Sequence, residues 1–380
     1  MIQLVRAGLI YRNPQPHLRS RQAFFPSLVN LGAGELLCTF DIGEAVEALD
    51  CRTYCARSLD GGRTWALQGP LFEHPAERPS SSSLRTSLTP DGTLVAAGSR
   101  AYRGSPEQGL VNRENLGYAR MDLILLRSRD RGRTWSPPET VEPPLVGPAF
   151  ETCHHIVARG GGRWLWPTST WRGWDGSLPN GERAVVLISD DAGRSWPRYG
   201  TSFGGDGSGL IHWEQSVLEL ADGRLLALAW AFDPAAGRTL PTPYSLSTDG
   251  GETFGPPRPT GLHGQTCKGL ALRDGRILCL YRRESPAGLW ANLSRLEGGE
   301  WVNLAELPLW GTRLQDSGMT GRCSAGEELS SLKFGYPSML ELEEGHVLAA
   351  FWCVEDCTSN IRWMSLKVDG PRGSGPPAQA

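Results

Sequence analysis

One phrase of eight residues occurs four times in this chain and constrains its fold more than any other feature. The copies share the pattern Ser-x-Asp-x-Gly-x-Thr-Trp, with Ser and Phe as single substitutes at the last two positions, and they cover residues 58–65, 128–135, 189–196 and 247–254. In such a phrase the Asp side chain can bond to the amides of its own turn, Gly supplies a positive φ, and the aromatic ring is buried. Each copy therefore predicts a hairpin turn with a hydrophobic anchor, and the repetition predicts a repeat architecture.

A second repeat accompanies the first. In each of its copies an alternating strand runs into a Gly and a second apolar strand follows, which is the pattern of a β-hairpin. Six such hairpins cover residues 26–40, 84–97, 156–166, 217–230, 270–281 and 338–352. We therefore predict six blades, with the octapeptide between the third and fourth strands of a blade. A strand at 361–368 can pair with residues 3–11 and close the ring, which leaves few exposed edges.

Composition agrees with one all-β propeller over residues 1–369. The chain has 47 Gly, 28 Pro and 14 Trp, which suits short strands, tight turns and aromatic packing between blades. Its 38 Lys and Arg balance 41 Asp and Glu, so we expect neither nucleic acid nor an anionic membrane as a partner. Residues 370–380, dominated by Gly, Pro and Ala, are expected to be a disordered tail.

The beginning of the sequence lacks the apolar run of a signal peptide, and no apolar stretch reaches the length of a bilayer, so we expect a cytoplasmic location. Nine cysteines fit reduced, buried thiols better than a disulfide framework. Cys51 and Cys55 share their spacing with Cys353 and Cys357, which leaves a four-Cys metal site as an alternative, although zinc pairs usually sit closer. No cofactor is expected.

The octapeptide resembles the Asp-box, or BNR repeat, of the sialidase (neuraminidase) superfamily, and together with the six hairpins it extends this resemblance over residues 1 to 369. The resemblance implies a six-bladed β-propeller. Asp-boxes also occur in propellers without catalytic activity, so they indicate the scaffold rather than the chemistry. Members with activity attack the sugar with a Tyr that a Glu activates, protonate the leaving group with an Asp, and bind a substrate carboxylate with three Arg.

Three catalytic positions have matches in this sequence. The stretch 212–223 resembles the segment that carries the activating Glu, which puts Glu214 at that position. The stretch 334–340 resembles the segment of the nucleophile, which indicates Tyr336, although Pro337 interrupts the match. The general acid is expected at Asp50, with Asp41, Glu44 and Glu47 as competitors in the same loop.

The arginine clamp is where the sequence departs from the family. Phe24 occupies the place of the first Arg and Trp230 that of the second, and no Arg stands at the expected third position. Aromatic rings cannot replace bidentate guanidinium binding of a carboxylate. The resemblance therefore implies a sugar that is bound by ring stacking and is not an ordinary sialoside.

Other residues can contribute to the substrate site. Arg21 and Arg282 alternate correctly for facing the centre, and His155 can act as an acid or base or hydrogen-bond a hydroxyl. Solvated arginines and a structural histidine are the alternatives. Four long interruptions of the repeats, at 100–120, 171–183, 199–213 and 309–334, are candidates for loops that cover a ligand.

The sequence thus leaves two functions open. The first is a sialidase-like exo-glycosidase that hydrolyses a terminal sugar at the central face, with Asp50 as acid, Tyr336 as nucleophile and Glu214 as activator. If Tyr336 is not the nucleophile, Asp50 and Glu214 can act as an inverting pair. The second is a propeller without catalytic activity that binds a glycan or a protein partner through the same face. The sugar, its linkage and the oligomeric state are not determined by the sequence.

Overall fold

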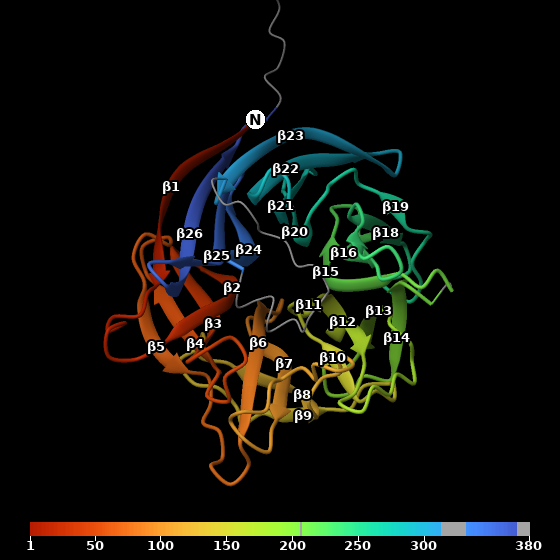
Figure 1. Ribbon diagram of the computed structural model, residues 1–380. Coiled ribbons are helices and arrows are strands. Elements are labelled where there is room, and N and C mark those ends of the chain that lie inside the picture. Colours follow the sequence, from red (N-terminus) through yellow and green to blue (C-terminus); the bar gives the residue numbers. More distant parts are fainter. Residues whose placement is uncertain (206, 313–331, 371–380) are drawn as a thin grey trace, which may run out of the picture.

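The computed structural model describes residues 1–205, 207–312 and 332–370, and these form a six-bladed β-propeller (Figure 1). Most of the expected tail at 370–380 and most of the interruption at 309–334 lie outside the described residues. Within the described ranges, no helix has the length and apolar character needed to cross a membrane.

Blades 1 to 3 follow one another along the chain. Blade 1 contains β2 (Gln22–Gly32), β3 (Glu35–Gly43), β4 (Arg52–Ser58) and β5 (Ala66–Pro70). Blade 2 contains β6 (Ser80–Leu88), β7 (Leu94–Tyr102), β8 (Met121–Ser128) and β9 (Glu139–Val141). In blade 3 the inner strand is split into β10 (Ala149–Glu151) and β11 (Val157–Ala158), followed by the 3₁₀ turn η1 (Gly160–Gly162), β12 (Trp164–Trp171), β13 (Ala184–Ser189) and β14 (Arg198–Phe203).

Blades 4 to 6 complete the ring. Blade 4 contains β15 (Ile211–Glu219), β16 (Leu225–Asp233), β17 (Arg238–Thr239), β18 (Pro243–Ser247) and β19 (Arg258–Pro259). Blade 5 contains β20 (Gln265–Ala271), β21 (Ile277–Arg283), β22 (Gly288–Glu297) and β23 (Glu300–Trp310). Blade 6 contains β24 (Phe334–Glu343), β25 (His346–Glu355), β26 (Thr358–Val368) and, as its outer strand, β1 (Ile2–Tyr11).

The expected closure of the ring is confirmed. Strand β1 pairs antiparallel with β26, from Ile2 opposite Val368 to Tyr11 opposite Ile361. Blade 6 is therefore built from both ends of the described chain, and the backbone hydrogen bonds between β1 and β26 lie within that blade.

Six hydrophobic clusters lie one at each contact between neighbouring blades, and a small seventh cluster contains Ala149, Trp171 and Ile211. Successive strand residues point to opposite faces, so they enter different clusters. On β3, for example, Leu36 packs toward blade 6 and Leu37 toward blade 2. Both faces of each sheet are covered, which explains why the second strands of the hairpins are almost continuously apolar.

The octapeptides form the turns that their sequence predicts. In the first copy, Asp60 Oδ1 accepts hydrogen bonds from the amides of Arg63 (3.0 Å) and Thr64 (2.9 Å), and Asp60 Oδ2 accepts one from Thr64 Oγ1 (2.7 Å). Gly62 has a φ of 89° and donates to Ser58 Oγ. Each turn lies beside the tip of its blade's inner hairpin, as in the bond from Gly61 N to Gly34 O.

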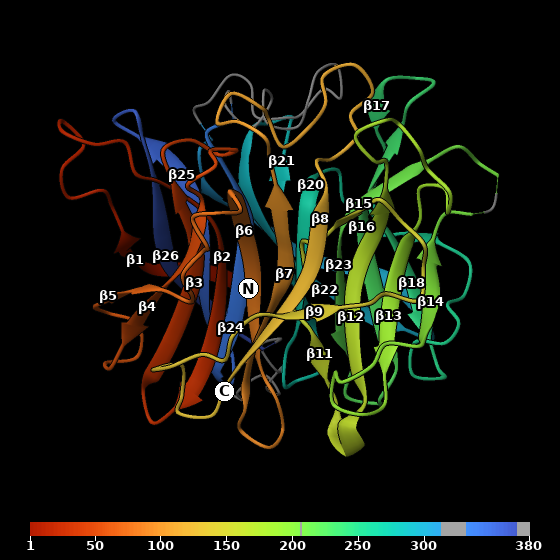
Figure 2. The ribbon, with the colours of Figure 1, turned by 90° about the horizontal axis from the view of Figure 1, so that it is seen from below.

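The propeller thus has two unlike ends. We call the end where inner strands begin the loop face and the end where they turn back the hairpin face. Figure 2 shows β17 near the loop face at the top and β11 toward the hairpin face at the bottom. The octapeptide turns belong to the hairpin face, so residues that act together on a ligand at the loop face must come from other parts of the sequence.

Candidate functional site

Four inner strands carry the same irregularity at the same depth. In β2, β15, β20 and β24 the pairing register breaks at a bulge, and a residue other than Gly has a positive φ there. These residues are Phe25 (56°), Glu214 (49°), Thr266 (54°) and Tyr336 (49°). Such backbone conformations are costly, especially for β-branched Thr266, and they cluster at functional sites. The bulges re-aim these side chains at the propeller axis.

Tyr336 crosses the axis. It belongs to blade 6, and its hydroxyl donates a short hydrogen bond to the backbone carbonyl of Cys153 in blade 3, the opposite blade. The same hydroxyl accepts a bond from Arg85 Nε of blade 2 (3.0 Å). Burial raises the pKa of Tyr336 well above its ordinary value, although the nearby Arg85 opposes this. The phenol is therefore neutral at physiological pH and is held from both sides.

Lys268 of blade 5 completes this arrangement. Its buried Nζ donates to three backbone carbonyls, those of Cys153 (3.0 Å), Glu214 (3.0 Å) and Gln215 (3.2 Å), and lies 4.7 Å from the centre of the Tyr336 ring. Burial lowers the pKa of Lys268. We call the group formed by Arg85, Lys268, Tyr336 and the Cys153 carbonyl the central plug. Together with the blade 4 carbonyls that Lys268 binds, this group links five blades across the axis.

Two carboxylates lie together beside the plug. Glu151 ends β10, and its Oε2 accepts a hydrogen bond from the backbone amide of Glu214 (3.1 Å). Burial raises the pKa of Glu151, and the neighbouring charge of Glu214 raises it further. The Glu214 side chain is half-buried, and its Oε2 accepts a short hydrogen bond from Thr266 Oγ1. A buried carboxyl group with a raised pKa and a more exposed one near it can act as proton donor and as base or nucleophile.

Three loops from blades 1 to 3 interlock on the loop face. Arg103 donates to the carbonyls of Glu47 and Ala48, and Glu47 Oε2 accepts from the amide of Leu110 (2.9 Å), which ties the blade 1 loop to the blade 2 loop. Two of the predicted interruptions, 100–120 and 171–183, also meet directly. Trp171 Nε1 donates to Leu116 O (2.7 Å), and Tyr118 forms a parallel bridge with Gly173.

Tyr118 connects these loops to the carboxylate pair. Its ring packs against Trp171, with centroids 5.9 Å apart. Its pKa is raised well above the ordinary value by burial and then by the charge of Glu151, so its hydroxyl is neutral and close to that carboxyl group. The interlocked loops thus border the carboxylate pair.

The structure separates the acidic residues that were considered for the role of proton donor. Asp50 is exposed, and its Oδ1 accepts the amide of Glu44 (3.0 Å) within a turn of the blade 1 loop. Asp41 is buried and accepts bonds from Thr53 (2.7 Å) and Ser83 (2.5 Å). Burial raises the pKa of Asp41, with Arg85 opposing the shift. Asp41 therefore belongs to the surroundings of the plug, whereas Asp50 stands apart from it.

The two aromatic residues in place of the arginines have packing partners. Phe24 lies edge-on against Trp352 (5.4 Å between centroids), and Trp230 packs on Trp213 (4.7 Å). Phe24 and Trp230 are buried, so neither offers a free ring face to a sugar. Trp213 is half-buried and also packs against Trp171 and Phe232, with 5.5 Å between centroids in each case.

The remaining substrate-binding candidates do not gather at one point. Arg21 lines a separate surface pocket with Tyr11 and Asn13. Arg282 is buried and donates to Gln265 Oε1 (2.8 Å) beside the plug. His155 lines a cavity on the hairpin side of the plug, away from the carboxylate pair.

The cysteines that raised the question of a metal site are free thiols. Cys51, Cys55 and Cys353 are buried and Cys357 is exposed. Burial raises the pKa of Cys55 and of Cys353 to about 12, so both are protonated. Within the residues that the structure describes, no group of three or more His, Cys, Asp or Glu side chains is arranged to hold a metal ion.

Sequence reasoning missed Glu151, Arg85 and Lys268. Glu151 lies ahead of the predicted third hairpin, residues 156–166. The prediction leaves it out because the inner strand of blade 3 consists of two separate short strands, β10 and β11, rather than one alternating run. The sequence does contain a feature that points to Arg85 and Lys268 as residues with buried partners. Each is a long cation inside an otherwise apolar or small-residue inner strand, where a charged side chain needs buried partners.

Comparisons with known proteins agree with this architecture. None of the curated proteins compared with this chain matches it. A Dyadobacter fermentans protein of unknown function is similar in structure, with 21% identity, a TM-score of 0.72, and coverage of 97% of this chain and 99% of the other. The α-L-arabinanase of Penicillium chrysogenum, solved with arabinobiose, has 16% identity, a TM-score of 0.66, and coverage of 96% and 98%.

The sialidase of Trypanosoma rangeli, solved with sialic acid, has 14% identity and a TM-score of 0.62, covering 92% of this chain and 54% of the sialidase. At these identities the likeness concerns the fold. The family model described as a BNR repeat-like domain matches residues 109–348. The chain therefore belongs to the BNR repeat-like domain family and has the fold of the sialidase superfamily.

Proposed function

We propose that this protein is a glycoside hydrolase that releases a neutral terminal sugar at the loop face, with Glu151 and Glu214 as its two catalytic carboxyl groups. The observation that carries the proposal is that the Glu151 side chain accepts a hydrogen bond from the backbone amide of Glu214 (3.1 Å), which brings Glu151 near the residue whose charge raises its pKa. Two adjacent carboxyl groups that cannot both ionise freely supply the acid and the base that glycoside hydrolysis needs.

The surroundings of the two carboxyl groups support a different catalytic role for each. Glu151 has the raised pKa, so it donates the proton to the leaving oxygen as the glycosidic bond breaks. Glu214 is more exposed and remains in position, through Thr266 and the bulge of β15, to stabilise the positive charge that develops on the sugar ring or to attack it. The proton returns to Glu151 from the water that completes the hydrolysis.

Tyr336 is not needed as a nucleophile in this mechanism. Its hydroxyl donates to the Cys153 carbonyl and accepts from Arg85, whereas the Glu214 carboxylate accepts from Thr266. We therefore assign Tyr336 to the support of the two carboxyl groups. This differs from the sequence-based hypothesis, in which Glu214 activates Tyr336.

A neutral substrate follows from the missing clamp. Phe24 and Trp230 stand at positions where binding of a substrate carboxylate would need guanidinium groups. Both rings are packed against other aromatic rings of the protein. The half-buried Trp213 is the aromatic side chain that we propose to contact a neutral sugar. The similar structures include an α-L-arabinanase and an α-L-arabinofuranosidase, so arabinofuranosides are the first neutral sugars to test.

The test is a panel of aryl glycosides that contains arabinofuranosides, deoxy-sugars, uronides and sialosides. It is run with the wild type, Glu151→Gln, Glu214→Gln and the control Glu219→Gln. Glu219 lies on the same strand as Glu214 but at the hairpin end, where it pairs with Arg159 (2.7 Å). We expect turnover of a neutral glycoside that falls at least a hundredfold in the first two variants and is unchanged in the control.

Two results would speak against the proposal. Turnover that survives both Glu151→Gln and Glu214→Gln would remove these residues from the mechanism. Absence of turnover with the whole panel, together with binding of a glycan, would favour the second function that the sequence leaves open, a propeller without catalytic activity. Preference for the sialoside would contradict the argument from Phe24 and Trp230.

A further inference from the structure

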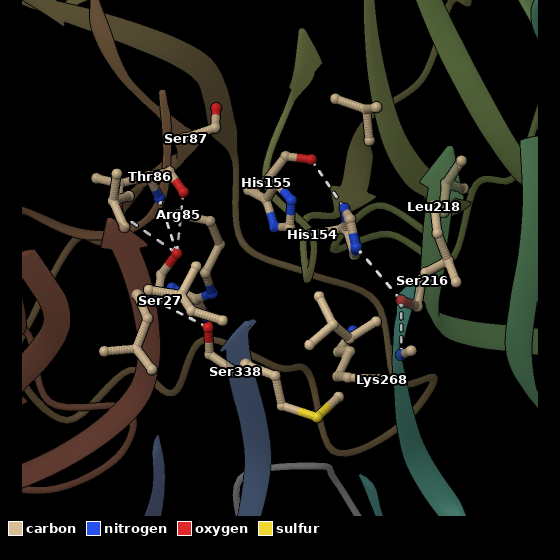
Figure 3. Close-up of a pocket in the computed structure, with 18 of the residues that line it drawn as sticks. Ser27, Arg85, Thr86, Ser87, His154, His155, Ser216, Leu218, Lys268 and Ser338 are labelled. Carbon is tan, nitrogen blue, oxygen red and sulfur yellow. Dashed lines mark hydrogen bonds between the residues drawn. The ribbon is translucent and has the colours of Figure 1, made fainter. Parts of the chain in front are cut away.

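A cavity of about 430 Å³ lies on the axis between the central plug and the hairpin face. Figure 3 shows His154, His155, Ser216 and Lys268 around it, opposite Ser27, Thr86 and Ser338. Arg85, Lys268, Tyr336 and Cys153 are among the lining residues, so the plug forms the inner end of the cavity. Its volume is in the range of pockets that hold small organic molecules.

The walls of the cavity are largely aliphatic. They consist of side chains from the second halves of the inner strands and from the segment that follows Cys153, including Leu28, Ile156, Leu218, Leu270, Met339 and Leu340. Leu270, Met339 and Leu340 are only half-buried because they face this space. An apolar body of a ligand would gain from contact with these walls.

The inner end of the cavity is positively charged. Arg85 and Lys268 both reach it. Arg85 Nη1 lies 3.6 Å from Asp41 Oδ2, behind the lining, whereas Arg85 Nη2 makes no hydrogen bond to any described residue. The described lining residues include one carboxylate, Glu219, which Arg159 pairs with at the rim. The positive charge also affects the histidines, because burial and then Lys268 lower the pKa of His155 to about 4.

Two hydrogen-bonding groups in the wall are unused. Ser87 Oγ is buried and has no partner among the described residues. The His155 ring stacks on His154 with 4.2 Å between centroids and makes no side-chain hydrogen bond within the described chain. His154, in contrast, donates from Nδ1 to the His155 carbonyl (2.8 Å), which leaves Nε2 to accept from Ser216 (3.4 Å). His155 and Ser87 can therefore serve a ligand without breaking an internal bond.

We propose that this axial cavity is a binding site for a small amphipathic organic anion, a carboxylate on an apolar body. The carboxylate would lie near Arg85, which supplies the charge, and near the neutral His155 ring, which supplies a hydrogen-bond donor, and the apolar body would lie along Leu218, Leu270 and Leu340. Charge complementarity selects an anion, and the aliphatic walls exclude a purely inorganic one. The site is on the other side of the plug from Glu151 and Glu214, so it is independent of the proposed catalytic activity.

The test compares phenylacetate with its neutral isostere phenylacetamide by isothermal titration calorimetry at pH 7. We expect the Kd of phenylacetate to be at least tenfold lower. Leu340→Trp fills the cavity and should abolish binding, whereas Leu342→Trp changes a half-buried Leu of the same strand that does not line it and should leave the Kd unchanged. His155→Phe should weaken phenylacetate at least fivefold and phenylacetamide little.

Several outcomes would overturn the site. They are equal affinity for the acid and the amide, unchanged binding in Leu340→Trp, and absence of binding to the wild type. If Leu340→Trp does not fold, Ala158→Trp fills the cavity from another wall. Glu214→Gln should bind phenylacetate with the wild-type Kd, so failure of the catalytic proposal and failure of this one are separate results.

Discussion

The backbone amide of Glu214 donates a hydrogen bond to the side chain of Glu151, with 3.1 Å between Glu214 N and Glu151 Oε2. The two residues come from neighbouring blades, β10 and β15, so the contact also holds these blades in register near the axis. This hydrogen bond fixes the Glu151 carboxyl group relative to the backbone of Glu214. The pair therefore responds as a unit to changes at either residue.

The activity that we propose should have a pH dependence set by Glu151. Its pKa is raised by burial and by Glu214, and it must be protonated to act as the acid. We therefore expect kcat/KM to fall as the pH rises through the raised pKa of Glu151. In Glu151→Gln this alkaline limb should disappear, and activity should be about 10² to 10⁴ times lower at the optimum. A pH profile of both proteins measures this, and an unchanged alkaline limb in the variant would contradict it.

Tyr336→Phe should destabilise the protein. The change removes the bond to the Cys153 carbonyl and leaves Arg85 Nε without its acceptor in a buried place. A buried group without a partner costs about 1–3 kcal/mol, so we expect the free energy of unfolding in urea to fall by about that amount. Tyr54→Phe is the control, since the Tyr54 hydroxyl bonds to no described residue and the change should be nearly neutral. Equal effects would refute the role of Tyr336 in the plug.

The contact between two loops should be sensitive to a single methyl group. A Cβ on Gly117 would lie 1.8 Å from the Gly173 carbonyl oxygen, so the loops at 103–120 and 171–183 cannot keep their positions in Gly117→Ala. We expect a loss of about 1–3 kcal/mol in the free energy of unfolding and faster proteolysis in these loops. Gly160→Ala meets nothing within 4 Å and should behave as the wild type. Wild-type resistance of Gly117→Ala to proteolysis would show that the loops are not locked together.

The octapeptide turns should make stability depend on acid pH. Hydrogen bonds from the Ser195 side chain and backbone lower the pKa of Asp191 to about 2, and bonds from Thr64 lower that of Asp60 to about 2. Because the pKa of each Asp is lower in the folded protein, its hydrogen bonds stabilise the fold fully above about pH 4, the pKa of Asp in the unfolded chain. This contribution to the free energy of unfolding is lost as the pH falls toward about 2. Urea midpoints measured from pH 6 to 2 should therefore decline least in Asp60→Asn and Asp191→Asn. A decline as steep as that of the wild type would argue against these bonds.

The scaffold could be predicted from sequence because its signals are local. A turn such as 58–65 is specified by its own eight residues, and a hairpin such as β2 and β3 by its own alternation. The candidate site, in contrast, is formed by residues from different blades. The expectation of the acid at Asp50 rested on a spacing within one loop, whereas the proposal of Glu151 rests on its burial, which depends on which blades meet at the axis. Glu214 and Tyr336 could be proposed from the sequence because each stands just before a recognisable hairpin.

The pairing of β1 with β26 has a consequence for how the molecule is made. Strand β1 is synthesised before every other described strand, but the partner that it needs, β26, is synthesised after all of them. Blades 1 to 5 can form in order as the chain emerges, whereas blade 6 must wait with one of its strands already exposed. Ring closure is then the last event of biosynthetic folding, and a ribosome stalled before β26 would carry an open propeller with an unpaired edge on β1.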